Sequence, residues 1–165
     1  MAIHATANPA NVRRSVEKYL VDTFQGATGI PTDIEAANWW WQNRKIDTGS
    51  LDYFVRVRVD RVAQTLFGSS LNIVWFSLFL EVWAKRVAYD TAPDTLEQTL
   101  GLLRGGLTRG TAIGLYDYVE NGVSATIQQY LTVEEPRLPI TAEEGEWVRS
   151  SWDVTLRTIE TDTSS

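Results

Sequence analysis

The chain has 165 residues, of which 44% are hydrophobic and 22% are charged, values typical of a globular protein with one domain. It contains no cysteine and a single histidine, His4, which excludes disulfides, thiolate metal sites and most catalytic templates, because these templates need a well-held imidazole. The formal net charge of −6 argues against a protein that grips the phosphates of nucleic acid.

Two further features of the composition bear on function. Seven tryptophans are more than such a chain usually carries, which favours either a protein that binds other proteins or a Trp-rich core. Residues 134–165 hold eight acidic and three basic residues, so nearly all of the negative charge lies in this segment. We interpret the segment as solvated surface, or as a face that repels DNA or meets a basic partner.

The first predicted element is a helix that starts at Asn8-Pro9 and ends near Gln25-Gly26. Asn can cap a helix, Pro is tolerated at the first helical position, and Gly suits the position after the last turn. Apolar residues recur along this segment at helical spacing, namely Val12, Val16, Tyr19, Leu20 and Phe24. The pattern predicts an amphipathic helix that packs on a sheet.

Residues 32–42 predict a short strand, and residues 43–52 predict a polar loop. In a strand Trp39 and Trp41 share one face and Trp40 takes the other, because side chains alternate. Three consecutive tryptophans cannot all enter one core, so we expect at least one of them to reach the surface or an interface.

Two long strands are predicted at residues 53–61 and 71–84, and they are expected to pair as an antiparallel hairpin. In the second strand Val74, Phe76, Leu78, Leu80 and Val82 share a face that suits a core. The opposite face carries Trp75, Phe79 and Trp83, and the first strand places Arg56 and Arg58 on one face. We expect the Trp75 face to be either an interface or covered by a helix of the same chain. The predicted interface residues are Trp39, Trp41, Arg56, Arg58, Trp75, Phe79 and Trp83.

This strand is also the most apolar stretch of the chain, so it decides whether membrane insertion is expected. Its 14 residues are fewer than the roughly 20 that a spanning helix needs, and Glu81 interrupts them. The N-terminus lacks the basic and apolar blocks of a signal peptide. We therefore expect no membrane partner.

The rest of the chain predicts one helix, one connector and two strands. Residues 91–104 predict a helix with a capping box at 95–98, and the glycine-rich residues 107–122 predict an irregular connector. Residues 124–134 and 146–160 predict strands, and residues 1–8 and 161–165 predict disordered ends. The whole chain, 1–165, is thus predicted to be one α+β domain, an antiparallel sheet of about four to five strands with helices packed on one face.

Motifs for catalysis or cofactor binding are weak. The glycines at 101–114 are not followed by the Gly-Lys-Ser/Thr of a phosphate loop. The pairs Glu134-Glu135 and Glu143-Glu144 have the chemistry of divalent-cation ligands, but they lie in a segment expected to be solvated. We predict no catalytic residue, no cofactor and no metal site.

The layout resembles the tail terminator, or tail-completion, proteins of long-tailed bacteriophages. The resemblance covers residues 9–160 and rests on the opening helix, Gly29-Ile-Pro31, the strands at 53–59 and 72–84, the helix after Pro93 and the closing strand at 146–156. The triplet Trp39-Trp40-Trp41 and the long connector at 107–122 depart from the family's pattern.

The resemblance implies a structural virion protein and no enzyme. Its subunits form a ring, typically a hexamer, at the head-proximal end of the tail, where the ring caps the tail tube. Implied partners are further copies of the chain, the tail tube protein, the neck or connector protein and the sheath protein, while DNA passes through without specific binding. The implied location is the virion, with assembly in the host cytoplasm.

Two alternatives stay open at this point. One is another head–tail neck or tail tube component of the virion, and a tube protein should form filaments by itself. The other is a small-ligand binding domain or enzyme that uses the loop at 105–122, which nucleotides or metals would stabilise against heat.

Overall fold

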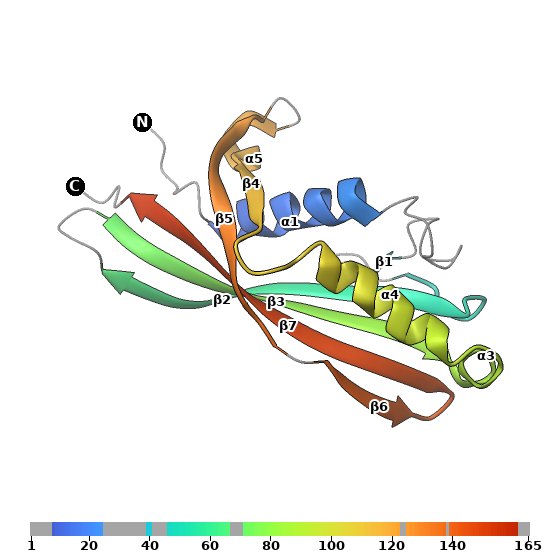
Figure 1. Cartoon of the computed structure of the whole chain (residues 1–165). Helices are drawn as coiled ribbons and strands as arrows, with labels where there is room; N and C mark the ends of the chain where they lie inside the picture. Colours follow the sequence, from blue (N-terminus) through green and yellow to red (C-terminus); the bar gives the residue numbers. More distant parts are fainter. Residues whose placement is uncertain are drawn as a thin grey trace.

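A computed structural model describes residues 8–24, 39–40, 46–66, 71–122, 125–137 and 139–161. Over these residues the chain forms one seven-stranded sheet in the order β1-β2-β3-β7-β5-β4, with β6 paired to β7 (Figure 1). The α+β prediction is confirmed, although the sheet has more strands than predicted. The strands are β1 (Trp39–Trp40), β2 (Tyr53–Leu66), β3 (Leu71–Lys85), β4 (Ala112–Tyr116), β5 (Ile127–Pro136), β6 (Ile140–Glu144) and β7 (Trp147–Thr161). The helices are α1 (Pro9–Phe24), α3 (Arg86–Thr91), α4 (Asp94–Gly105) and α5 (Tyr118–Asn121).

Helix α1 begins where the sequence predicts. The side chain of Asn8 accepts a hydrogen bond of 3.0 Å from the backbone N–H of Asn11, as an N-cap residue does. The helix ends at Phe24, and the predicted stop at Gln25-Gly26 lies outside the described residues. No helix in the described ranges is long and apolar enough to cross a membrane.

Strands β2, β3 and β7 form the long antiparallel centre of the sheet. Val55 pairs with Val82 and Val57 with Leu80, so the predicted hairpin is confirmed. Strand β2 continues five residues past its predicted end at Arg61. A bulge between Arg61 and Ala63 shifts the alternation there, which removes the sequence signal for the second half of the strand.

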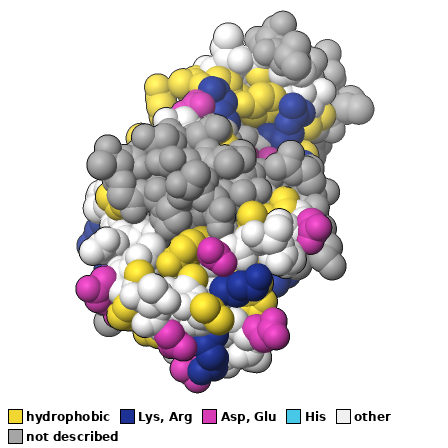
Figure 2. Space-filling model, turned by 90° about the vertical axis from the view of Figure 1, so that its right-hand side faces the viewer, with side chains coloured by type: hydrophobic (Ala, Val, Ile, Leu, Met, Phe, Trp, Pro, Cys, Tyr) yellow, Lys and Arg dark blue, Asp and Glu magenta, His cyan; other side chains and the backbone are white. Residues whose placement is uncertain are grey.

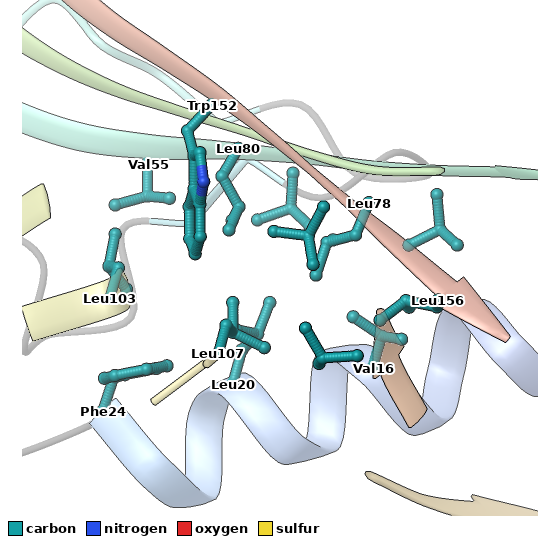
Figure 3. Packing of buried hydrophobic residues seen from close by; sticks show 14 of the residues in the cluster. Val16, Leu20, Phe24, Val55, Leu78, Leu80, Leu103, Leu107, Trp152 and Leu156 are labelled. Carbon is teal, nitrogen blue, oxygen red and sulfur yellow. The ribbon is translucent and has the colours of Figure 1, made fainter. Parts of the chain in front are cut away.

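The core lies between this sheet and the helices α1 and α4, which cover one of its faces (Figure 1). Figure 3 shows Val16, Leu20 and Phe24 of α1 pointing toward side chains that descend from the sheet. The predicted core residues of β3 are all buried, with exposed fractions of 0% to 1%: Val74, Phe76, Leu78, Leu80 and Val82. Each such side chain contributes about 1.5–3 kcal/mol by leaving water.

The connections after β3 differ from the prediction. The helix predicted at 91–104 is α4, which begins three residues later, and the short helix α3 precedes it where no helix was predicted. The predicted capping box at 95–98 is wrong, because Pro93 is the N-cap residue and no side chain caps the helix. The connector at 107–122 contains β4 and α5, and the acidic turn before β7 contains β6.

Strands β4 and β5 bend away from the long strands toward α1 (Figure 1). Buried polar bonds fix this corner: the side chain of Asn11 donates to Asp117 at 3.0 Å and accepts from the N–H of Val119 at 3.0 Å. The backbone N–H of Tyr116 donates to Ser15 at 2.9 Å. The predicted disordered ends lie outside the described residues except for Asn8, which caps α1, and Thr161, which ends β7.

Candidate interaction surface

The side of the long strands that faces away from α1 and α4 is the candidate functional surface, and we call it the outer face. Its positions follow from the alternation along β2, β3 and β7 and from their register. In the described part of the chain no helix lies on it (Figure 1). Its aromatic and arginine side chains are Phe54, Arg56, Arg58, Trp75, Phe79, Trp83, Trp147, Arg149 and Arg157.

Three aromatic rings form a cluster at the end of the outer face next to α3. The rings of Phe54 and Trp83 stack, with centroids 5.6 Å apart and an interplanar angle of 8°. Trp147 meets Phe54 edge-on at 5.1 Å. The guanidinium of Arg149 lies 5.7 Å from the ring centroid of Trp83. Because each ring is held by its neighbours, this part of the face is rigid before any partner binds.

A buried carboxylate ties the same region together. Glu81 is only 3% exposed and accepts hydrogen bonds of 3.0 Å from the indole N–H of Trp83 and 3.0 Å from Arg149. Arg56 lies 3.9 Å from it, and Arg149 also pairs with Glu144 at 2.8 Å. The charges therefore neutralise one another across the four strands β2, β3, β7 and β6, which lets a carboxylate stay buried beside the aromatic cluster.

Farther along the face, rings and guanidinium groups alternate. Arg58 lies 5.8 Å from the ring centroid of Phe79, and Arg157 lies 6.0 Å from that of Trp75. Arg157 also pairs with Glu134 at 2.8 Å. Aromatic residues and arginine are the types enriched at the centres of protein–protein interfaces. The outer face thus has the composition of a contact surface, spread over three long strands.

The structure brings five of the seven predicted interface residues together on the outer face, namely Arg56, Arg58, Trp75, Phe79 and Trp83. The prediction for Trp39 is wrong, because this residue is 1% exposed and belongs to the core. Strand β1 pairs in parallel with β2, and Trp39 lies opposite the buried Val55. Trp41 lies outside the described residues.

Sequence reasoning missed the contribution of β7 to this surface. Along β7, these outward side chains alternate with buried ones. Trp147 and Arg149 flank the buried Val148, and Arg157 follows the buried Leu156. The same alternation that identified the inward positions of this strand therefore marked the outward ones. Their proximity to Trp83 and Trp75 depends on the β3–β7 register, which residue patterns alone do not give.

Three of the four carboxylates in the acidic pairs, which were considered as cation ligands and not predicted to be a metal site, make ion pairs. Glu134 pairs with Arg157, Glu143 with Arg86 at 3.1 Å, and Glu144 with Arg149. Among the described residues, no three His, Cys, Asp or Glu side chains gather where they could hold a metal ion. The glycines at 101–114, which lack the rest of a phosphate-loop motif, fall in α4, in the turn after it and in β4.

A second polar surface lies on α1 and α5. The guanidinium of Arg14 stacks 4.2 Å from the ring centroid of Tyr118, and Lys18 pairs with Asp22 at 2.7 Å. The hydrogen bond with Asp22 raises the pKa of Lys18, and burial raises the pKa of the Tyr118 phenol. Both cations on this surface already have a partner, and the surface carries fewer aromatic rings than the outer face does.

Comparisons with known proteins add information on the fold. No protein family and no curated protein matches the sequence. Among similar solved structures is a protein whose name states no function, with a TM-score of 0.53 and 15% sequence identity, covering 96% of this chain and 99% of the other. At this identity the likeness concerns the fold alone.

Proposed function

We propose that the protein is a structural virion subunit that forms a ring, typically of six copies, at the head-proximal end of a phage tail. The ring caps the tail tube and joins it to the neck or connector protein, and in tails with a sheath it also meets the sheath protein. The observation that supports this proposal best is the outer face, where aromatic side chains and guanidinium groups cover three strands without a described helix above them.

The shape of this surface favours a protein partner over a small ligand. Small-molecule sites are concave and enclose most of their ligand, whereas the outer face extends over three strands, with pockets beside Arg157 and Trp75 at its side toward β5. Its arginines are already paired with Glu81, Asp60 and Glu134. A partner therefore meets a surface whose charges are balanced and whose rings are held in place, which lowers the entropy lost on binding.

The overall charge fits a position around DNA. With a net charge of −6, the chain repels the phosphates of DNA that passes through the ring, so no specific DNA binding is proposed. The proposed location is the virion, after assembly in the host cytoplasm.

The proposal is tested by the mass of the purified protein in solution and by truncation of the outer face. We expect a closed oligomer, and we expect Trp75→Ala to weaken its assembly at least about tenfold, as loss of a central interface aromatic does. Val119→Ala is the matched control, because Val119 is 51% exposed on α5, away from the outer face. A strict monomer that is absent from tails would contradict the proposal. Filaments formed by the pure protein would favour a tail tube component.

A further inference from the structure

A pocket of about 410 Å³ opens at the C-terminal end of α4. Arg104, Thr108 and Arg109 form part of its wall, while Pro136 of β5 and Trp152 of β7 complete it with apolar surface. We call it the arginine pocket. Its residues Arg104 and Gly105 belong to α4, which lies on the opposite side of the sheet from the outer face (Figure 1), so the pocket is separate from that face.

Its two arginines differ from the others that the structure describes. Neither Arg104 nor Arg109 has a carboxylate within 4 Å or a ring beneath its guanidinium among the described residues. Arg14 stacks on Tyr118, and the remaining arginines whose side chains the structure describes each pair with a carboxylate: Arg13, Arg56, Arg58, Arg86, Arg137, Arg149 and Arg157. The C-terminus of α4 stabilises the charge of Arg104, but Arg109 lies beyond the helix and gains little from it.

A complementary group of carboxylates lies at the opposite end of α4. Asp90, Asp94, Glu97 and Glu146 are exposed there and have no ion-pair partner among the described residues, and we call them the acidic end. A hydrogen bond of 2.7 Å from the N–H of Arg86 to the carbonyl of Glu146 holds the turn after β6 beside α3. Figure 2 looks onto this end of the molecule and shows several Asp and Glu side chains spread around it.

The cations next to the acidic end are already occupied. Arg86 pairs with Glu143, and Lys85 donates to the carbonyl of Gly49 at 3.2 Å. Within one copy the acidic end cannot reach the arginine pocket, because Asp94 and Arg104 are ten residues apart in one straight helix, or about 15 Å along its axis. Each of these charged groups therefore lacks an ion-pair partner among the residues that the structure describes.

We propose that the arginine pocket of one copy receives the acidic end of a second copy. The inference rests on the proposed self-assembly and names the surfaces that meet. Since the two surfaces differ, the contact is head-to-tail, the type that closes into a ring or continues as a filament. The acidic end adjoins the Trp83–Trp147 end of the outer face, because α3 follows β3 directly. The same contact therefore brings that aromatic cluster against the neighbouring copy.

Charge reversal tests this pairing. Arg104→Glu with Arg109→Glu is expected to weaken assembly at low salt by about tenfold or more, measured by sedimentation or native mass spectrometry. Glu146→Lys with Asp94→Lys is expected to weaken it similarly, and the protein carrying all four changes is expected to assemble again, because each contact then pairs inverted charges. Arg14→Glu with Lys18→Glu is the control. It changes the net charge as much as Arg104→Glu with Arg109→Glu does, but on α1, and should leave assembly unchanged.

Thermal unfolding checks that every variant is folded. If Asp94→Lys destabilises α4, Glu146→Lys alone replaces the double variant of the acidic end. Reversal variants that assemble like the unmodified protein would overturn the inference while the proposed ring stands. A four-fold variant as defective as either pair would overturn it too. An unmodified protein that stays monomeric at every concentration would overturn the inference together with self-assembly.

Discussion

Glu81 illustrates how single residues hold the outer face in one arrangement. It lies on the side of β3 without a described helix, yet neighbouring side chains leave only 3% of it exposed. Its partners come from the adjacent strand β7 and from Trp83 on its own strand. A carboxylate in such a place is tolerated only while these donors remain.

Glu81→Ala is expected to lower the free energy of unfolding by about 2–3 kcal/mol, because Arg149 and the indole of Trp83 then lose their buried acceptor. The value lies below that for a fully buried pair, since Arg149 keeps Glu144 and is itself 28% exposed. Urea denaturation measures the change. Glu97→Ala, on the exposed side of α4, is the control and should change stability by less than about 0.5 kcal/mol. Equal losses for both variants would contradict the role given to Glu81.

Two adjacent glycines at the end of α4 should respond oppositely to alanine. A Cβ at Gly106 would lie 2.4 Å from the ring of Phe24, which is itself buried in the core, whereas nothing lies within 4 Å of a Cβ at Gly105. Gly106→Ala should therefore destabilise the protein by about 1–3 kcal/mol through overpacking. Gly105→Ala should be neutral or stabilise it by up to about 1 kcal/mol. Thermal unfolding measures the stability of the two variants. If Gly105→Ala were the less stable one, the packing of Phe24 of α1 against Gly106 would be contradicted.

At the scale of elements, both faces of strand β3 carry large apolar side chains. One face carries Phe76 and Leu78 into the core, and the other carries Trp75 and Phe79 to the outer face. Trp83 belongs to the outer face but also stacks on Phe54, which is 4% exposed. Its truncation should therefore cost stability as well as the proposed assembly, which makes Trp75 the cleaner probe of the proposed interface.

Trp75→Ala and Phe76→Ala separate the two faces of β3. Phe76→Ala should lower the free energy of unfolding by about 3–5 kcal/mol, because it leaves a cavity in the core. Trp75→Ala should lower it by less than about 1.5 kcal/mol, because the indole is partly exposed, and should mainly weaken assembly. Denaturation of dilute protein gives the first quantity and sedimentation the second. A loss of stability at Trp75 equal to that at Phe76 would show that the outer face is part of a core.

At the scale of the whole molecule, periodicity predicts the elements that bury one face. The strands β2, β3 and β7 and helix α1 have regular apolar positions, so the sequence locates them. Strand β6 gives no such signal, because its residues are mostly exposed on both sides. Strand β4 was hidden by Gly114, where a Cβ would lie 2.9 Å from the side chain of Ile127, so the glycine serves a close approach and not a loop.

In the candidate site, too, the sequence predicts what depends on alternation along one strand but not what depends on contacts between distant residues. Trp75, Phe79 and Trp83 could be assigned to one face from alternation along β3 alone. The network around Glu81 could not, since it joins Arg149 to a residue 68 positions earlier in the chain. Trp39 was misplaced because the triplet of tryptophans carries no sign of which ring points inward, and its parallel pairing with β2 decides that.

The position of the protein in a virion tests the proposed function most directly. Antibodies against the protein, viewed on intact particles by electron microscopy, are expected to label one site per particle, at the junction between head and tail. Label along the whole tube, at the distal tip of the tail or nowhere on the particle would contradict the proposal.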